Sequence, residues 1–85
     1  METKKWIINW FVQEKSIPET DLMNNIEMNY FDLGYISSLS FVTLLVDIEA
    51  AFNVEFNNDD FVDGSFFTIK GIINALDEKI QKMEV

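Results

Sequence analysis

The residues best placed to take part in chemistry lie at one junction, where a glycine-containing string meets a long apolar run. Ser38 stands near the end of that string, which reads Asp32-Leu33-Gly34-Tyr35-Ile36-Ser37-Ser38-Leu39. If a helix begins here, its first N–H groups are unpaired and its end is partly positive, so a phosphate ester would be favourably placed. No His, Cys or Lys in the string could activate Ser38 as a nucleophile. The pattern therefore indicates a serine that another enzyme modifies.

The composition indicates one small folded domain, residues 1–85, with little means of catalysis. Hydrophobic residues make up 48% of the 85 residues, too large a share for a disordered chain. Cysteine and histidine are absent, which excludes disulfides, thiolate metal sites and the commonest general base. No apolar stretch approaches the ~18 residues of a membrane span, and the N-terminus lacks a signal-peptide cleavage pattern. We therefore expect a cytoplasmic protein with neither a metal site nor a membrane span.

Charge is distributed unevenly along the chain. Fifteen acidic residues face six lysines, arginine is absent, and every charged residue between Ser16 and Ile69 is acidic. Such a surface repels nucleic acid and anionic lipid and attracts basic partners. The alternative interpretation is that the acidity only keeps a small apolar domain in solution.

Apolar periodicity predicts a first helix and a long connection after it. The first helix is expected from about Thr3 to Lys15, with Thr3 as its N-cap, and Pro18 cannot continue it. Residues 19–33 are expected to wrap over the helices as a connection, with one short helical turn near Asp21.

The second helix is expected to start at Ser37 or Ser38 and to end near Phe52. One apolar stripe is predicted to face the core and comprises Phe41, Leu44, Leu45, Ile48 and Phe52. A second stripe, offset from the first, comprises Leu39, Val42 and Val46. This second stripe is either buried in the core or kept for a partner, and the sequence leaves both interpretations open.

The C-terminal part of the chain predicts two more helical segments. Residues 59–61 look like a short helical turn, with Gly64 and Ser65 breaking it. Thr68 is expected to cap a last helix whose apolar stripe comprises Ile69, Ile72, Ile73, Leu76 and Ile80. We expect the core-facing stripe of the second helix to pack against this stripe and against Trp10 or Phe11 of the first helix.

These residues together resemble the acyl carrier protein family, which includes peptidyl and D-alanyl carriers. The resemblance spans the chain and rests on Phe31-Asp32-Leu33-Gly34, Ser38-Leu39, Ile48-Glu49-Ala50-Ala51-Phe52, Asp59-Asp60-Phe61 and Phe67-Thr68-Ile69. It implies an all-α fold: a small four-helix bundle of acyl-carrier type with a long first loop and a short third helix.

The resemblance also implies a function. Ser38 would carry a 4′-phosphopantetheine arm, taken from coenzyme A, whose thiol holds an acyl or aminoacyl group as a thioester. The implied partners of this monomer are a phosphopantetheinyl transferase, an acyl- or aminoacyl-loading enzyme, and condensing or acyltransferase enzymes. The implied settings are fatty acid, polyketide or nonribosomal peptide biosynthesis. The residues that it assigns to partner docking are Leu39, Val42, Thr43, Val46, Asp47 and Glu49.

The sequence departs from the family pattern beside the modified serine. The residue before it is usually Asp, but here it is Ser37, which is both a rival attachment site and a candidate N-cap. This departure keeps open an alternative, an acidic helical adaptor without a prosthetic group. A third interpretation, catalysis by paired carboxylates such as Asp47 and Glu49, is disfavoured because no base, metal-ligand set or glycine-rich phosphate loop accompanies them.

Overall fold

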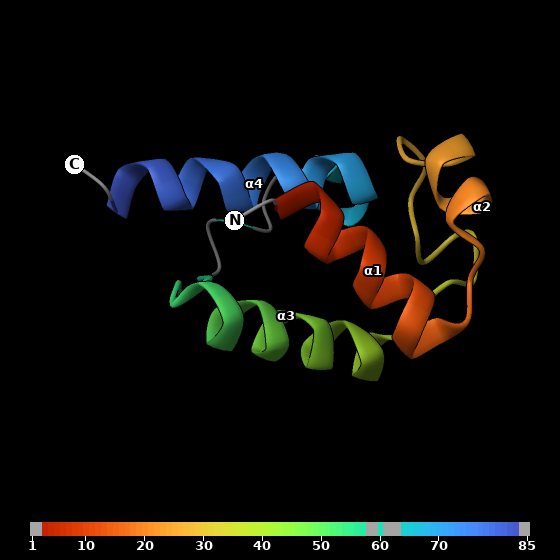
Figure 1. Cartoon of the computed structure of the whole chain (residues 1–85), viewed down its shortest axis with the longest axis horizontal. Coiled ribbons are helices and arrows are strands. Elements are labelled where there is room, and N and C mark those ends of the chain that lie inside the picture. The colour runs from red at the N-terminus through yellow and green to blue at the C-terminus, as the bar shows by residue number, and fades with distance from the viewer. Residues whose placement is uncertain (1–2, 58–59, 61–63, 84–85) are drawn as a thin grey trace.

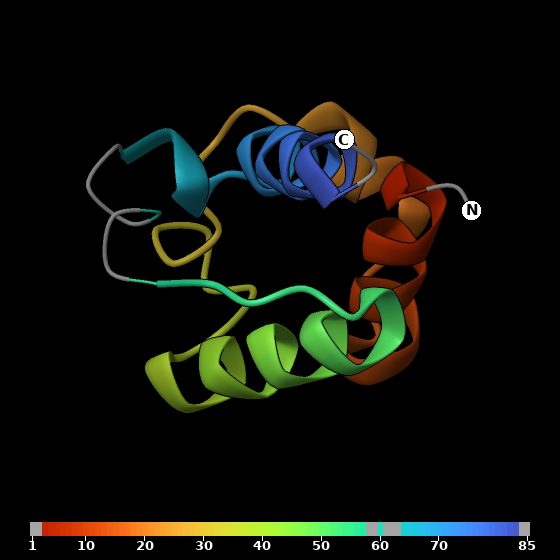
Figure 2. The same cartoon turned by 90° about the vertical axis from the view of Figure 1, so that its left-hand side faces the viewer.

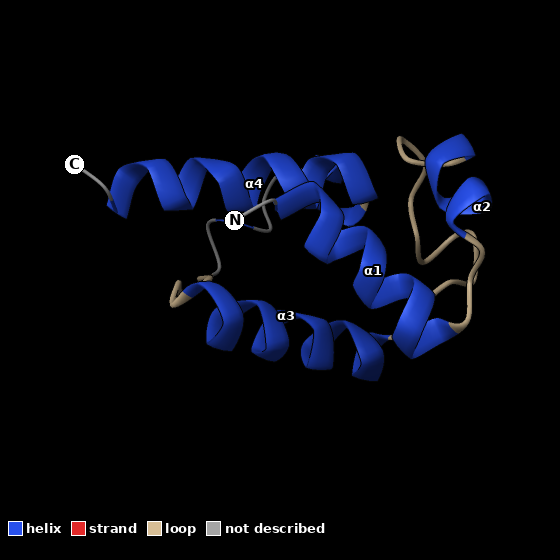
Figure 3. Ribbon diagram, viewed as in Figure 1, coloured by secondary structure: helices blue, strands red, loops and turns tan. Residues whose placement is uncertain are grey.

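The protein, described by a computed structural model at residues 3–57, 60 and 64–83, folds as an all-α domain (Figure 1). Its α-helices are α1 (Thr3–Lys15), α2 (Glu19–Asn24), α3 (Ser38–Phe52) and α4 (Ile69–Met83), and the 3₁₀ helix η2 (Gly64–Phe67) precedes the last of them. Figure 3 shows helices and loops, with no strand in the parts that are described. The predicted fold class, a small helical bundle of acyl-carrier type, is confirmed.

The two longest helices, α3 and α4, lie on opposite sides of the molecule, and α1 runs obliquely between them (Figure 1). The connection from α2 to α3 passes between the levels of α4 and α3, as the view turned by 90° also shows (Figure 2). The long side chain of Lys15, at the end of α1, reaches Ser40 in the first turn of α3.

The core draws on every helix and on the connection. Its buried hydrophobic residues are Ile7, Ile8, Trp10, Phe11, Leu22, Tyr30, Ile36, Leu44, Ile48, Val54, Phe66, Ile69, Ile72, Ile73 and Leu76. Burial of this apolar surface is the main source of stability. Leu44 and Ile48, both fully buried, confirm that the first stripe of α3 faces the core.

The bounds predicted for α1 are confirmed, but the role predicted for Thr3 is wrong. Thr3 lies inside the first turn of α1 and is buried, and its hydroxyl donates a hydrogen bond to the carboxylate of Asp77 on α4. A capping residue instead lies outside the helix and bonds to its own first turn. Packing between α1 and α4 thus uses this hydroxyl for a contact between helices.

The region predicted as a short third helix is only partly described. Asp59 and Phe61 lie outside the described residues, whereas Asp60 lies in a 3₁₀ turn and pairs with Lys79 of α4 at 3.0 Å. Gly64 and Ser65, predicted to break the helical run, begin the separate 3₁₀ helix η2, and residues 61–63, where the break is predicted, lie outside the described residues.

The short turn predicted near Asp21 is confirmed as α2, and the connection that follows it is tied to η2 and α4 by backbone contacts. The Tyr30 N–H donates to the carbonyl of Phe67 at 3.0 Å, and the Lys70 N–H donates to that of Ile26 at 2.9 Å. The buried Tyr30 hydroxyl donates to the carbonyl of Phe66 at 2.9 Å. These contacts explain how a long connection is ordered: its polar groups find partners on other elements.

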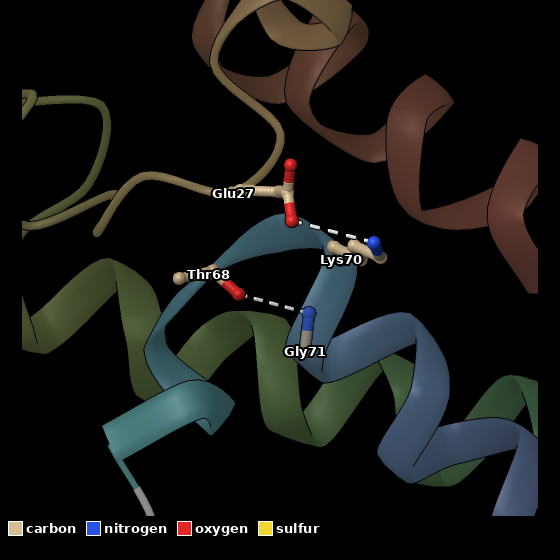
Figure 4. A network of polar contacts seen from close by, with 4 residues as sticks. All are labelled: Glu27, Thr68, Lys70 and Gly71. Carbon is tan, nitrogen blue, oxygen red and sulfur yellow. Dashed lines mark hydrogen bonds and ion pairs between the residues drawn. The ribbon is translucent and has the colours of Figure 1, made fainter.

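The start of α4 confirms the predicted cap and adds an ion pair. The Thr68 hydroxyl oxygen accepts a hydrogen bond from the Gly71 N–H at 2.9 Å, which is the N-cap geometry (Figure 4). Beside it, the Lys70 ammonium group pairs with Glu27 of the connection at 3.3 Å (Figure 4). Both groups of this pair are well exposed, so it adds little to stability. Among the described helices, none is long and apolar enough to cross a membrane.

Candidate functional site

Ser38 is the first residue of α3, and its side chain is exposed to solvent. Ser37 is the N-cap: its backbone is extended, with φ −99° and ψ 174°, and its hydroxyl oxygen accepts a hydrogen bond from the Ser40 N–H at 3.3 Å. The capping role predicted for Ser37 is confirmed. The hydroxyl of Ser37 is therefore engaged by its own helix, while that of Ser38 points to no partner within the described residues.

The first turn of α3 is suited to an anion. It contains no acidic side chain, and within the described part of the chain the N–H groups of Ser38 and Leu39 have no hydrogen-bond acceptor. Unpaired amides and the helix dipole together make this end partly positive. A phosphodiester on the Ser38 hydroxyl therefore fits the residues that are present.

The approach to Ser38 is set by a turn and an anchor. Gly34 has φ +74°, in the left-handed region that side chains disfavour, and a Cβ there would meet no atom within 4 Å. Glycine is therefore needed here for its conformation and not for lack of space. The Tyr35 N–H donates to the carbonyl of Tyr30 at 3.0 Å, and Ile36 is buried, so the last residues before α3 are held against the core.

Lys15, the last residue of α1, reaches this same turn. Its ammonium group donates a hydrogen bond to the Ser40 hydroxyl at 2.5 Å, and that hydroxyl lies 3.3 Å from the one of Ser37. Sequence reasoning did not connect Lys15 with the site, because the contact depends on where α1 ends relative to α3.

The second stripe of α3 is exposed, as one of the two predicted alternatives required. The exposed fractions are 79% for Leu39, 55% for Val42 and 56% for Val46. Thr43 lies on the same face and is exposed, and its hydroxyl donates to the carbonyl of Leu39 at 3.3 Å within the helix. This face, Leu39, Val42, Thr43 and Val46, is called the apolar face below.

Asp47 and Glu49, also predicted to dock partners, have contacts within the chain. The Asp47 carboxylate accepts a hydrogen bond from the Trp10 indole N–H at 2.8 Å, and the Glu49 carboxylate accepts one from the Phe56 N–H at 2.9 Å. At 100° per residue these two acids flank the apolar face on opposite sides. They are consequently separated, and they do not form the carboxylate pair that catalysis would require.

The core-facing stripe of α3 belongs to one hydrophobic cluster with Trp10, Phe11 and the apolar stripe of α4, as predicted, and its aromatic residues also contact further rings. Phe52 packs edge-to-face on Trp6 with ring centroids 5.5 Å apart. Phe41 lies 5.4 Å from Phe31 and 5.8 Å from Phe67. An aromatic cluster formed by the connection and η2 thus supports the first turn of α3. Within the described part of the chain, no group of three or more His, Cys, Asp or Glu residues is arranged to hold a metal ion.

Comparison with known proteins adds independent findings. The family model described as a phosphopantetheine attachment site matches residues 6–76. D-alanyl carrier proteins from Streptococcus equi subsp. zooepidemicus (strain MGCS10565) and subsp. equi (strain 4047) are each 31% identical to this chain over 78 residues. The matched segments cover 92% of this chain and 95% of each relative. No solved structure matches the chain.

Proposed function

The chain belongs to the family of carrier proteins with a phosphopantetheine attachment site, and on that premise we propose that Ser38 bears the covalently attached 4′-phosphopantetheine arm. The arm, when present, supplies the thiol that forms a thioester with the cargo. The chain itself has no cysteine, so it offers no thiol of its own for this purpose.

The assignment to Ser38 is supported by the different contacts that the hydroxyl groups of two neighbouring serines make. Ser37 already uses its hydroxyl to cap α3, whereas the Ser38 hydroxyl is exposed and has no partner within the described residues. Ser37 thus replaces the usual Asp without loss of capping, which weakens the case for an adaptor that has lost its arm.

In modification, the Ser38 oxygen forms the phosphodiester with the pantetheine phosphate of coenzyme A, and adenosine 3′,5′-bisphosphate leaves. Since the chain contains no histidine, the transferase supplies the base that takes the Ser38 proton. The positive end of α3 then favours the phosphodiester charge.

The cargo that the comparisons favour is a D-alanyl group. Relatives named D-alanyl carrier proteins match over 92% of this chain and 95% of their own length. We therefore propose that an aminoacyl-activating enzyme loads D-alanine onto the arm.

Partner enzymes are proposed to dock on the apolar face of α3. Its residues are exposed and uncharged, whereas the flanking acids Asp47 and Glu49 are engaged within the chain. We therefore propose that partner enzymes recognise this face through apolar contacts. The net charge of −9 favours basic partners at longer range.

The test of attachment is the intact mass after incubation with coenzyme A and a phosphopantetheinyl transferase. The wild-type chain and Ser37→Ala are expected to gain the mass of one arm, and Ser38→Ala is expected to gain none. Modification of Ser38→Ala but not of Ser37→Ala would move the site to Ser37. No mass gain in the wild-type chain would instead favour the adaptor.

The test of cargo uses the modified protein with ATP, an aminoacyl-activating enzyme from a D-alanyl carrier system, and either D-alanine or L-alanine. D-alanine is expected to add a mass increment that hydroxylamine removes, as a thioester requires. Equal loading by the two enantiomers, or no loading by D-alanine, would contradict the proposed cargo.

A further inference from the structure

Tyr35 joins the loop before α3 to the end of α2 through its side-chain hydroxyl. The Asn25 side-chain amide donates a hydrogen bond to this hydroxyl at 3.1 Å, and the hydroxyl donates to the backbone carbonyl of Asp21 at 3.5 Å. Asn25 is the C-cap of α2, and its side chain and its backbone N–H both donate to the same Asp21 carbonyl. The Tyr35 hydroxyl therefore belongs to a small polar network that satisfies the last turn of α2.

The ring and the backbone of Tyr35 are also held in place. The ring is half-buried and packs against the hydrophobic core, and the Tyr35 N–H donates to the carbonyl of Tyr30 at 3.0 Å. The residue before it, Gly34, forms the turn with φ +74°, and the residue after it, Ile36, is buried. Tyr35 is thus held by both backbone and side chain at the point where the chain leaves this turn for α3.

Ser38 lies three residues after Tyr35, so their Cα atoms are at most about 11 Å apart. Ser37, which stands directly before Ser38, is bonded to the first turn of α3: its carbonyl accepts from the Phe41 N–H at 2.9 Å, and its hydroxyl oxygen accepts from the Ser40 N–H at 3.3 Å. Within the described residues the Ser38 hydroxyl has no partner of its own. Its position therefore depends on the backbone that carries it.

We propose that Tyr35 is a positioning residue for modification: by tying the loop to α2, its hydroxyl holds the backbone that presents Ser38 to the transferase. The inference rests on the proposed attachment at Ser38. An enzyme that meets a preformed loop does not have to order it on binding, and ordering a loop costs free energy. The helix α2 thereby contributes to the site, although it lies outside the string of residues around the serine.

The test is the rate at which a phosphopantetheinyl transferase modifies Tyr35→Phe, which keeps the ring and loses the hydroxyl. Well below Tm, kcat/KM for the carrier is expected to fall about 3–10-fold, the range that one lost hydrogen bond gives. KM for coenzyme A should stay unchanged, because the change affects only how the carrier presents its serine. A purely structural contact would instead lower Tm and leave the modification rate of the folded protein at the wild-type value.

Amide hydrogen exchange measures the loop directly in the unmodified protein. The N–H groups of Tyr35, Ser40 and Phe41 bond to the loop or to its last residue, so they report its opening. They are expected to exchange about 3–10-fold faster in Tyr35→Phe than in the wild-type chain. Unchanged exchange at these groups would show that the hydroxyl does not hold the loop.

The matched control is Tyr30→Phe, the same chemical change at the other of the two tyrosines. It removes the buried hydrogen bond to the Phe66 carbonyl at 2.9 Å, which ties the connection to η2 and not to α2. Tyr30→Phe is expected to lower the unfolding free energy more than Tyr35→Phe does, but to leave kcat/KM for modification at the wild-type value.

Asn25→Ala removes the same contact from the side of α2 and should also slow modification. In the double variant Asn25→Ala/Tyr35→Phe, the loss of kcat/KM should be smaller than the product of the two single losses, because both changes remove one shared contact.

Three results would overturn the proposal: a wild-type kcat/KM in Tyr35→Phe, an equal loss in Tyr30→Phe, or losses that multiply fully in the double variant. If Tyr35→Phe does not fold, Asn25→Ala tests the contact with Tyr35 intact, and a wild-type rate there has the same consequence. Absence of the arm's mass from the wild-type chain would remove the proposed function together with this inference. Full modification of the wild-type chain with an equal rate in Tyr35→Phe would remove this inference alone.

Discussion

Asp47 and Trp10 join α3 to α1 through one hydrogen bond, and its removal measures how strongly α3 is held in place. The perturbation is a double-mutant cycle with Trp10→Phe, Asp47→Ala and the two changes combined. The indole donor is only 6% exposed, and its acceptor is a half-buried carboxylate 2.8 Å away. A hydrogen bond to a charged group is worth about 1.5–3 kcal/mol, and partial exposure of Asp47 favours the lower end.

We therefore expect a coupling free energy of about 1.5 kcal/mol between Trp10 and Asp47. The assay is urea unfolding of the unmodified protein, followed by circular dichroism. With an m-value of about 1 kcal/mol/M, the coupling corresponds to about 1.5 M in the unfolding midpoint. The cycle subtracts the loss of indole area, which Trp10→Phe causes whether or not Asp47 is present.

A coupling below about 0.5 kcal/mol would refute the structural role of Asp47. In that case a docking role predicts a different pattern: Asp47→Ala would leave the unfolding midpoint unchanged and weaken transfer to partner enzymes. Thr43→Ala is the control on the apolar face, and it should change the unfolding free energy by less than about 0.5 kcal/mol.

Further predictions concern the apolar face and the core. Val46→Asp should leave the unfolding midpoint nearly unchanged, because the side chain is 56% exposed, while slowing cargo transfer in a coupled assay; a collapsed midpoint would show that Val46 is core. Leu44→Ala should cost about 2–5 kcal/mol in urea unfolding, and Phe52→Ala, only half-buried, should cost less; the reverse order would contradict the burial pattern. Tyr30→Phe should cost about 1 kcal/mol, because a buried hydrogen bond to Phe66 is lost. Burial raises the pKa of the Tyr30 phenol above its unfolded value, so wild-type stability should fall as pH rises above about 10, and Tyr30→Phe should lack that part of the fall.

The elements whose signals are local were predictable from the sequence. The bounds of α1 and α3 follow from apolar residues at helical spacing, and Pro18 and Asn53 lie just beyond the two C-terminal ends. The caps formed by Ser37 and Thr68 depend on atoms only three residues apart. Such features depend on neighbours along one chain segment, so residue type and spacing are sufficient.

The roles of individual polar side chains were not predictable in this way. Thr3 was expected to cap α1, but its hydroxyl contacts Asp77 of α4. Asp47, which is predicted to dock partners, also accepts a hydrogen bond from Trp10 of α1, and the sequence did not indicate this contact. No local pattern indicated that the Tyr30 hydroxyl holds the connection to the segment before α4. Each contact depends on the rotation and crossing of two elements that are distant in sequence.

The candidate site likewise combines features set by local sequence with features set by contacts between distant elements. The sequence by itself determined that a serine stands at a helix start, that Ser37 can cap the helix, and that one stripe of α3 is apolar and free of charge. Only the tertiary structure decided that this stripe stays exposed, that Asp47 and Glu49 accept hydrogen bonds within the chain, and that Lys15 contacts Ser40 in the first turn of α3. The physical reason is the sequence separation of the residues involved. Helix caps and apolar stripes depend on residues a few positions apart, whereas exposure and charge pairing depend on which distant helix packs against the residue.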